Sequence, residues 1–133
     1  ARVRLREQVR VMRELVFRES PRKTPFNLCF DGWTNCTGHH IYAFIYRGEG
    51  PYTCVFMKQE QRDGVQSAEW LAGVIQRIRQ EMLTLNRVLV SCTSDNAAVC
   101  VRALAIVNED KDLAHVVHHR CVCHGLSLLV GEV

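Results

Sequence analysis

The chain has 133 residues, of which 47% are hydrophobic and 23% are charged, and its formal net charge is +3. This composition is close to the average of globular proteins, which excludes an intrinsically disordered chain. Its apolar runs are shorter than the roughly 18 residues needed to cross a bilayer, so we expect no transmembrane helix and no membrane partner. The N-terminal stretch also shows no apolar signal-peptide region.

The seven cysteines lie mainly within apolar runs. An odd number of cysteines in such positions fits buried free thiols better than a framework of disulfides. We therefore expect an intracellular protein.

Positive charge is concentrated at the N-terminus. Residues 1–23 carry eight Lys or Arg against three Glu, whereas the rest of the chain is slightly acidic. Apolar residues recur at helical spacing and predict an amphipathic helix over residues 2–19, closed by Ser20 and Pro21. The stripe consists of Leu5, Val9, Met12 and Val16. Residues 1–23 are thus predicted to form a basic helix and a linker.

Two interpretations of this basic helix remain open. It is a solvated helix that packs on the domain, or it faces DNA or another partner. In the second case Arg6, Arg10 and Arg13 are the candidate DNA contacts.

The remaining residues, 24–133, predict one α/β domain. Apolar and β-branched runs predict strands at 26–31, 41–46, 52–57, 88–93 and 115–123. Helical periodicity predicts helices at 65–84, at 97–107 and from 124 onward. The first three strands are joined by turns and should pair antiparallel, while strands that follow helices should return parallel. We therefore expect a mixed sheet with helices packed on it.

Two aspartates follow apolar strands in this scheme. Asp31 closes the first predicted strand, and Asp95 follows the fourth. If these strands are parallel neighbours, both carboxylates lie at the edge of the sheet where ligands of open α/β sheets bind. Magnesium typically takes one or two protein carboxylates. Two such ions about 4 Å apart can clamp the attacking and leaving oxygens of a phosphodiester.

The same residues also fit a purely local interpretation. Asp31 followed by Gly32 is common turn chemistry. Ser94, Asp95 or Asn96 suits the cap of the helix that follows. Spacing alone leaves both interpretations open.

Three motifs resemble, in order, the landmarks of the hAT superfamily of DNA transposases. They are "FDGWTN" at 30–35, "SDNAA" at 94–98 and "RCVCHGLSLLV" at 120–130. The resemblance covers residues 24–133 and implies an RNase H-like catalytic domain.

By this resemblance, Asp31 and Asp95 match the first two acids of a D-D-E triad that holds Mg²⁺ or Mn²⁺. The implied activity is cleavage and strand transfer at transposon ends, in the nucleus, with DNA as the partner. The residues that match the supporting motif positions are Trp33, Asn96, Cys121 and His124.

The family's third acid lies further downstream, after a helical insertion, and we expect it beyond Val133. This chain is therefore predicted to be the first part of a split core, inactive by itself. The family's dimerisation region is also absent, so any homo-oligomer would form through other parts. The alternative is a domesticated, non-catalytic protein that uses the same fold to bind DNA or protein.

The cysteines and histidines of "HHRCVCHG" at 118–125 suggest a zinc-stabilised interaction domain as a further alternative. A second ligand pair is hard to name, so zinc is not expected. Nucleophilic catalysis by a Cys–His pair lacks an orienting partner. Trp33 is predicted to be a core or lid aromatic beside Asp31, with base stacking as the sharper alternative.

Overall fold

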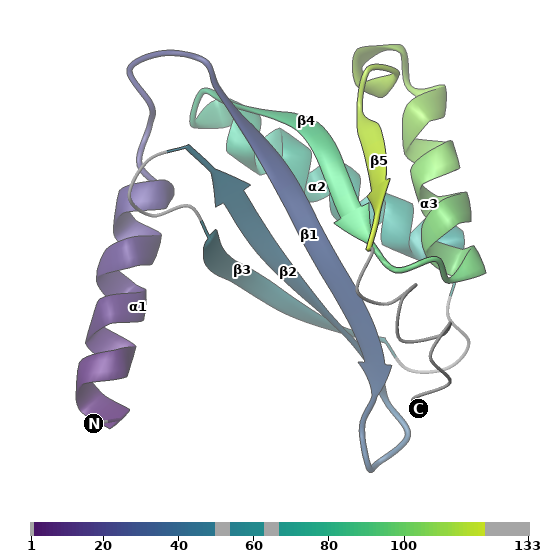
Figure 1. Cartoon of the computed structure of the whole chain (residues 1–133), viewed down its shortest axis with the longest axis horizontal. Coiled ribbons are helices and arrows are strands. Elements are labelled where there is room, and N and C mark those ends of the chain that lie inside the picture. Colours follow the sequence, from purple (N-terminus) through teal and green to yellow (C-terminus); the bar gives the residue numbers. More distant parts are fainter. Residues whose placement is uncertain (1, 50–53, 63–66, 122–133) are drawn as a thin grey trace.

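The computed structural model describes residues 2–49, 54–62 and 67–121 (Figure 1). Within these ranges the fold has three α-helices, one short 3₁₀ helix and a single five-stranded sheet. The elements are α1 (Arg2–Val16), β1 (Thr24–Thr34), β2 (His40–Gly48), β3 (Cys54–Arg62), α2 (Ala68–Thr84), β4 (Arg87–Ser94), α3 (Ala98–Glu109), η1 (Lys111–Leu113) and β5 (Val117–Arg120).

The sheet has the order β3-β2-β1-β4-β5. The pairs β1–β2 and β2–β3 are antiparallel, whereas β1–β4 and β4–β5 are parallel. The predicted mixed α/β sheet is therefore confirmed, with β1 at its centre beside β4. This placement matters most for the two aspartates, because it makes the strands that precede them parallel neighbours.

The hydrophobic core lies between the sheet and the helices α2 and α3. Alternation along β1 buries Phe26, Leu28 and Phe30 on one face, as the strand period of two requires. The rings of Phe26 and Phe30 pack on aromatic rings of β2, and Phe26 is stacked on Tyr46 at 5.1 Å between ring centroids. Figure 1 shows α2 behind the sheet and α3 beside β5, which leaves the opposite face of β1, β2 and β3 in front.

Helix α2 forms where its apolar stripe predicts it. The Ser67 side chain accepts a hydrogen bond from the Trp70 backbone N–H at 3.2 Å and so caps the helix. Leu71, Ile75 and Ile78 are fully buried on its inner face. Trp70 is partly buried and packs against the core.

Each of the first four strands is longer than predicted. β1 continues three residues beyond Asp31, because the hairpin with β2 pairs every position from Phe26 to Thr34. The turn after it is held by Asn35, whose Oδ1 accepts hydrogen bonds from Thr37 and His39. β3 runs on through polar residues to Arg62, since an edge strand that pairs on one side tolerates solvated side chains.

Helix α1 is shorter than predicted and ends at Val16 instead of residue 19. The Ser20 backbone N–H donates to the carbonyl of Leu85 at 2.8 Å, so the chain leaves the helix in order to join the end of α2. Val16 is buried against the core, but Leu5 is 63% exposed. The predicted stripe therefore packs on the domain only at the C-terminal end of α1.

The last strand is shorter than predicted, covering only Val117–Arg120. It pairs with the end of β4, from Ser91↔Val117 to Ser94↔Arg120. The helix predicted from residue 124 onward lies outside the described residues. In the part of the chain that is described, no helix is long and apolar enough to span a membrane.

Candidate metal-binding site at the β1–β4 edge

The parallel register of β1 and β4 brings Asp31 and Asp95 to the same level. The last matched pair is Cys29 with Thr93, and each aspartate lies two residues further along its own chain. Asp31 belongs to β1, and Asp95 follows the last residue of β4. The two carboxylates therefore reach the same edge of the sheet, as expected if these strands are parallel neighbours.

A pocket of about 300 Å³ lies at this edge and is lined by both aspartates. Cys29 and Thr93 form part of its wall, and Cys121, which follows β5, lines it as well. Asp31 is exposed and Asp95 is partly buried. The site thus opens to solvent and presents two carboxylates from adjacent strands.

Each carboxylate is fixed by one short-range hydrogen bond. The Gly32 backbone N–H donates to Asp31 Oδ1 at 2.9 Å, and the Ala97 N–H donates to Asp95 Oδ1 at 2.9 Å. These bonds occupy one oxygen of each carboxylate. The second oxygen of Asp31 has no hydrogen bond to any residue in the described ranges.

The structure tests the two local interpretations, in which Asp31 is a turn residue and Asp95 is a helix cap. Asp31 and Gly32 lie within β1 opposite Ala43 and Tyr42, so the turn interpretation of Asp31 is wrong. For Asp95 the cap interpretation holds only in part. Asp95 does accept the Ala97 N–H, but Ala97 itself is the N-cap of α3 and no side chain makes a cap hydrogen bond there.

Two buried groups, Tyr42 and Cys100, lie behind the aspartates. Burial raises the pKa of the Cys100 thiol to about 12, and Asp95 acts in the same direction through its charge and a hydrogen bond. Burial also raises the pKa of the Tyr42 hydroxyl to about 12, with Cys100, Asp95 and Asp31 adding to the shift. Both groups therefore stay protonated at neutral pH and leave the negative charge on the carboxylates.

On the open face of the sheet, a polar ladder crosses from β1 to β4 below the pocket. The Asn27 amide donates to Ser91 Oγ at 2.7 Å and to Thr93 Oγ1 at 3.2 Å. The Cys29 thiol donates to Asn27 Oδ1 at 3.1 Å. These bonds tie the two strands together just before the aspartates and so fix the distance between the strands that carry them.

The β5 side of the site is fixed through Ser94. The Cys121 backbone N–H donates to the Ser94 carbonyl at 2.8 Å, and Ser94 Oγ lies 2.8 Å from His118 Nε2. Burial lowers the pKa of His118, and the charges of Arg120 and His119 lower it further. Because the Ser94 hydroxyl donates to the Asp95 carbonyl at 3.0 Å, neutral His118 with its proton on Nε2 can donate to Ser94 Oγ at physiological pH.

The residues of the predicted supporting motif differ in position and exposure. Cys121 is partly buried and lines the pocket, whereas His124 lies outside the described residues. Asn96 is exposed. Trp33 is 45% exposed, so its interpretation as a core residue is wrong. It follows Asp31 by two residues on β1 and therefore lies on the same face of the strand.

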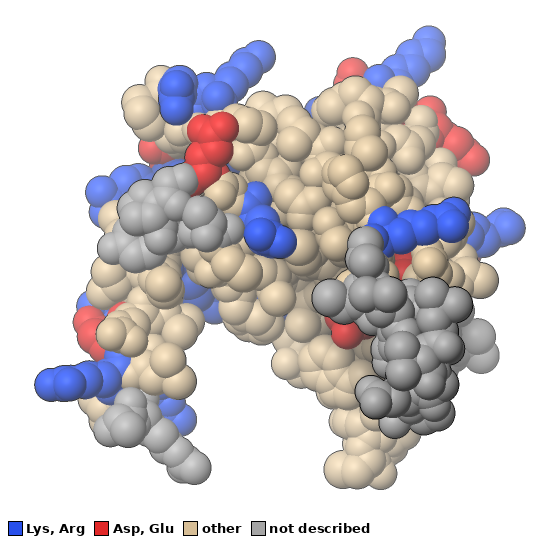
Figure 2. Space-filling model, viewed as in Figure 1, with Lys and Arg blue, Asp and Glu red and all other residues tan. Residues whose placement is uncertain are grey.

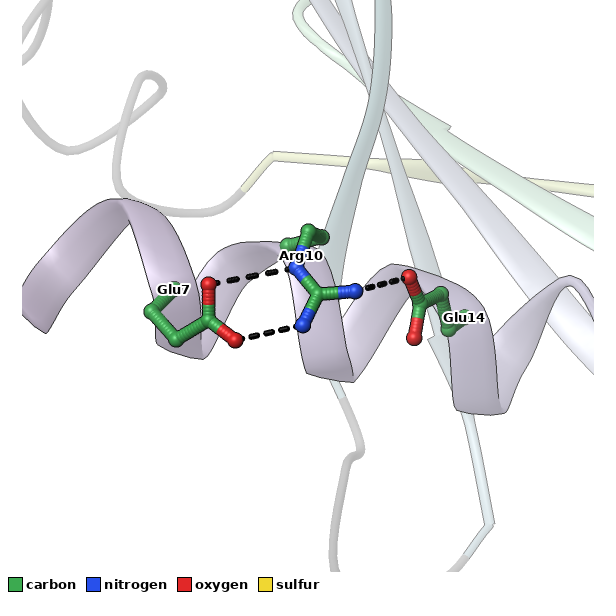
Figure 3. A network of polar contacts seen from close by, with 3 residues as sticks. All are labelled: Glu7, Arg10 and Glu14. Atoms are coloured by element: carbon green, nitrogen blue, oxygen red, sulfur yellow. Dashed lines mark hydrogen bonds and ion pairs between the residues drawn. The ribbon is translucent and has the colours of Figure 1, made fainter.

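The structure does not bring the three candidate arginines of α1 to the aspartates. α1 packs beside β3, two strands away from β1 in the sheet. Arg10 is held between Glu7 and Glu14 on the same helix (Figure 3). The Arg13 guanidinium donates to the Met57 carbonyl at 2.9 Å, and within the described ranges Arg6 makes no such contact.

The open face of the sheet is largely uncharged. Figure 2 shows mostly neutral side chains in the middle of this face, with Lys and Arg side chains towards its periphery. A polyanion that lies on this face would therefore find positive charge at the margins rather than over the strands.

The residues that sequence reasoning missed are the ones around the two carboxylates. Strand alternation places Cys29 beside Asp31, so this neighbour could have been found from the period of two. The placement of Thr93 required the β1–β4 register. Tyr42 and Cys100 approach from β2 and α3, and no spacing in the sequence indicates that they meet.

The donor set fits a hard divalent cation but is incomplete for a closed metal centre. Among the residues that the structure describes, no group of three or more His, Cys, Asp or Glu side chains could hold a metal ion. Two carboxylates with open coordination are what magnesium and manganese accept, with water and phosphate completing the shell.

The chain matches no known protein family. No curated protein matches it as a relative.

Proposed function

We propose that the chain is the first part of an RNase H-like catalytic core from a hAT-type transposase or a protein derived from one. In this role Asp31 and Asp95 hold Mg²⁺ or Mn²⁺ for cleavage and strand transfer of DNA in the nucleus. The observation that supports the proposal best is the common pocket of the two aspartates, at the ends of the parallel β1–β4 pairing.

The sheet is compatible with this fold. Three antiparallel strands come first, and the fourth and fifth strands run parallel to the first. Asp31 and Asp95 are the positions that match the family's first two acids. Both residues line one pocket at the ends of the parallel β1–β4 pairing, and this supports a shared metal site.

In the proposed chemistry the carboxylates of Asp31 and Asp95 supply oxygen lone pairs and negative charge to the metal. Backbone N–H groups orient Asp31 and Asp95, so their remaining lone pairs are available at the pocket. The protonated Cys100 and Tyr42 behind them add no competing charge. When bound, the metal would activate water and stabilise the charge on the phosphate. A third acidic residue from another part of the protein would complete the set.

DNA binding would use charges away from the pocket. α1 has a net positive charge and packs beside β3. Among the described residues Arg6 makes no hydrogen bond or ion pair, in contrast to Arg10 and Arg13. Positive charge there would attract phosphates in a manner that weakens with salt.

The first experiment measures Mn²⁺ binding to the 133-residue chain by electron paramagnetic resonance and calorimetry. We expect binding that Asp31→Asn and Asp95→Asn each weaken by at least about tenfold, since even outer-sphere partners of a metal are worth about 10- to 100-fold in affinity. Asp112→Asn is the matched control, because Asp112 is an exposed carboxylate on η1.

The outcomes separate the proposal from its alternatives. Equal weakening by Asp112→Asn would indicate non-specific binding to surface carboxylates and would contradict the metal site. Binding of Zn²⁺ that survives both Asp→Asn variants would favour a zinc-stabilised domain instead. If Mn²⁺ binds as expected, a longer protein that supplies the third acid should cleave DNA only with both aspartates present.

A further inference from the structure

The N-terminal part of α1 carries apolar surface that the domain leaves exposed. The C-terminal end of the helix is anchored by buried Val16 and by the hydrogen bond from the Arg13 guanidinium to the Met57 carbonyl at 2.9 Å. Towards the N-terminus the same apolar stripe emerges from the domain, with Val9 37% exposed and Leu5 63% exposed. An amphipathic helix normally buries such a stripe, so this part of α1 offers apolar surface to a partner.

Two adjoining hollows run along this helix. The first has a volume of about 460 Å³ and is lined by residues of α1 and by Phe17. The second has a volume of about 260 Å³ and continues to β3 and α2. Both are lined by Arg13 and Phe17, so they form one groove, which we call the α1 groove. Its apolar lining is provided by Val9, Phe17 and Met57, and Arg6 lines its outer end.

Two arginines leave uncompensated positive charge in the α1 groove. Arg6 makes no hydrogen bond or ion pair among the described residues, and Arg13 donates to a backbone carbonyl, which carries no charge. Arg10 differs, because Glu7 and Glu14 hold it from both sides (Figure 3). An anionic group that enters the groove would therefore meet two cations beside an apolar surface.

The lining of the groove discriminates among anionic partners. Two carboxylates, those of Glu14 and Glu81, line it together with the arginines. A nucleic-acid strand carries a charge at every phosphate, so it would meet these carboxylates as like charges, and its backbone has no apolar group to place on Val9. A peptide can set carboxylates opposite Arg6 and Arg13 and apolar side chains between them, as amphipathic helices do in grooves.

We propose that the α1 groove binds an acidic amphipathic peptide segment of a partner protein. Apolar side chains of the peptide rest on Val9 and Phe17, and its carboxylates pair with Arg6 and Arg13. The proposal is independent of the metal site, because the groove lies beside β3 and the two aspartates belong to the β1–β4 edge. It also differs from the DNA contact considered for Arg6, for which such a peptide would compete.

The test titrates the 133-residue chain with a synthetic peptide of leucine, phenylalanine and glutamate whose apolar residues recur every three or four positions. A helix of about twelve residues is long enough to run beside α1 from Arg6 to Phe17. We expect saturable binding in fluorescence anisotropy and NMR shift changes at the amides of Val9, Arg13 and Phe17. A scrambled peptide without the apolar stripe should bind about tenfold more weakly, the equivalent of two buried methylene groups.

Two variants test the charged and the apolar contacts separately. We expect Arg6→Gln to weaken peptide binding by up to about fivefold, the strength of an exposed ion pair. Val9→Ser should weaken it by about tenfold through the loss of buried apolar surface. Arg4→Gln is the matched control, because Arg4 is an exposed arginine of the same helix and is not among the described residues that line the groove. Circular dichroism checks that each variant stays folded.

The outcomes are distinct for each partner class. Absence of shift changes at the groove amides with millimolar peptide would overturn the proposal, as would equal weakening by Arg4→Gln and Arg6→Gln or unchanged binding by Val9→Ser. A DNA oligonucleotide or phosphatidylserine vesicles that shift these amides at lower concentration than the peptide would also overturn it, in favour of nucleic acid or lipid. A chain that binds the peptide but no Mn²⁺ would contradict only the metal site.

Discussion

The contact between Gly32 and Tyr42 allows a sharp test of how the strand that carries Asp31 is packed. A Cβ added at Gly32 would lie 2.6 Å from Tyr42 Cε1 and 2.9 Å from Cδ1 and Cζ. Carbon atoms in contact normally lie about 3.5–4.0 Å apart, so the ring would have to move by roughly 1 Å. Gly32→Ala is therefore expected to destabilise the fold.

The ring has little room to make that movement. Tyr42 is 3% exposed and packs against Trp70, whose other neighbour is the Arg62 guanidinium at 5.5 Å from the ring centroid. Overpacking of this kind costs about 1–3 kcal/mol. The smaller entropy of the unfolded alanine chain offsets roughly 0.4–1 kcal/mol of this cost. We expect a net loss of about 1–2 kcal/mol in the free energy of unfolding.

The assay is urea denaturation followed by circular dichroism, with thermal melting as a second measurement. The expected loss corresponds to a melting temperature lower by roughly 3–10 °C. In a double-mutant cycle, Gly32→Ala should cost less in a Tyr42→Leu background, because the shorter side chain removes the ring atoms in contact. Tyr42→Phe should give no such relief, since the close atoms are ring carbons.

A Gly32→Ala variant as stable as the wild type would refute this reasoning. It would mean that Tyr42 moves freely, and its fixed position behind the aspartates would then be in doubt. A loss of stability that is the same with and without the Tyr42 ring would point instead to the backbone of β1.

Three further predictions follow from other contacts. Gly73→Ala in α2 should raise the free energy of unfolding by about 0.5–1 kcal/mol, because a Cβ there meets no atom within 4 Å and alanine favours the helix; a decrease in urea denaturation would contradict this. Asn27→Ala should cost about 1 kcal/mol by breaking the ladder to Ser91 and Thr93, and an unchanged midpoint would show that the ladder contributes nothing. Because the pKa of His118 is lowered in the folded protein, its contribution to stability is present above the unfolded pKa near 6.5 and is lost as the pH falls through the folded pKa. His118→Gln should therefore flatten the pH dependence of unfolding in that acidic range, and a variant with the wild-type pH profile would count against this role.

Much of the fold follows from local patterns that the sequence displays directly. Helical spacing of apolar residues predicts α2, whose first turn is capped by Ser67. Alternation of apolar residues predicts β1, through Phe26, Leu28 and Phe30, and an apolar run predicts β4. The parallel direction of β4 was also predictable, because a helical crossover returns the chain in the same direction. Its position beside β1 entered the sequence argument only as a condition.

Element boundaries depended on partners far along the chain. β1 runs past Asp31 because β2 pairs with it as far as Thr34, and α1 stops at Val16 because Ser20 bonds to Leu85. No residue near Asp31 or Val16 signals these contacts. The exposure of Trp33 was likewise not visible from its apolar character.

For the candidate site, the sequence by itself determined which two carboxylates directly follow strand-forming apolar runs. Only the tertiary structure decided what surrounds them, since Tyr42 comes from β2, Cys100 from α3 and Cys121 from the segment after β5. The physical reason is that strand and helix periods fix the direction of a side chain relative to its own element. Which elements face each other is set by the packing of the whole core.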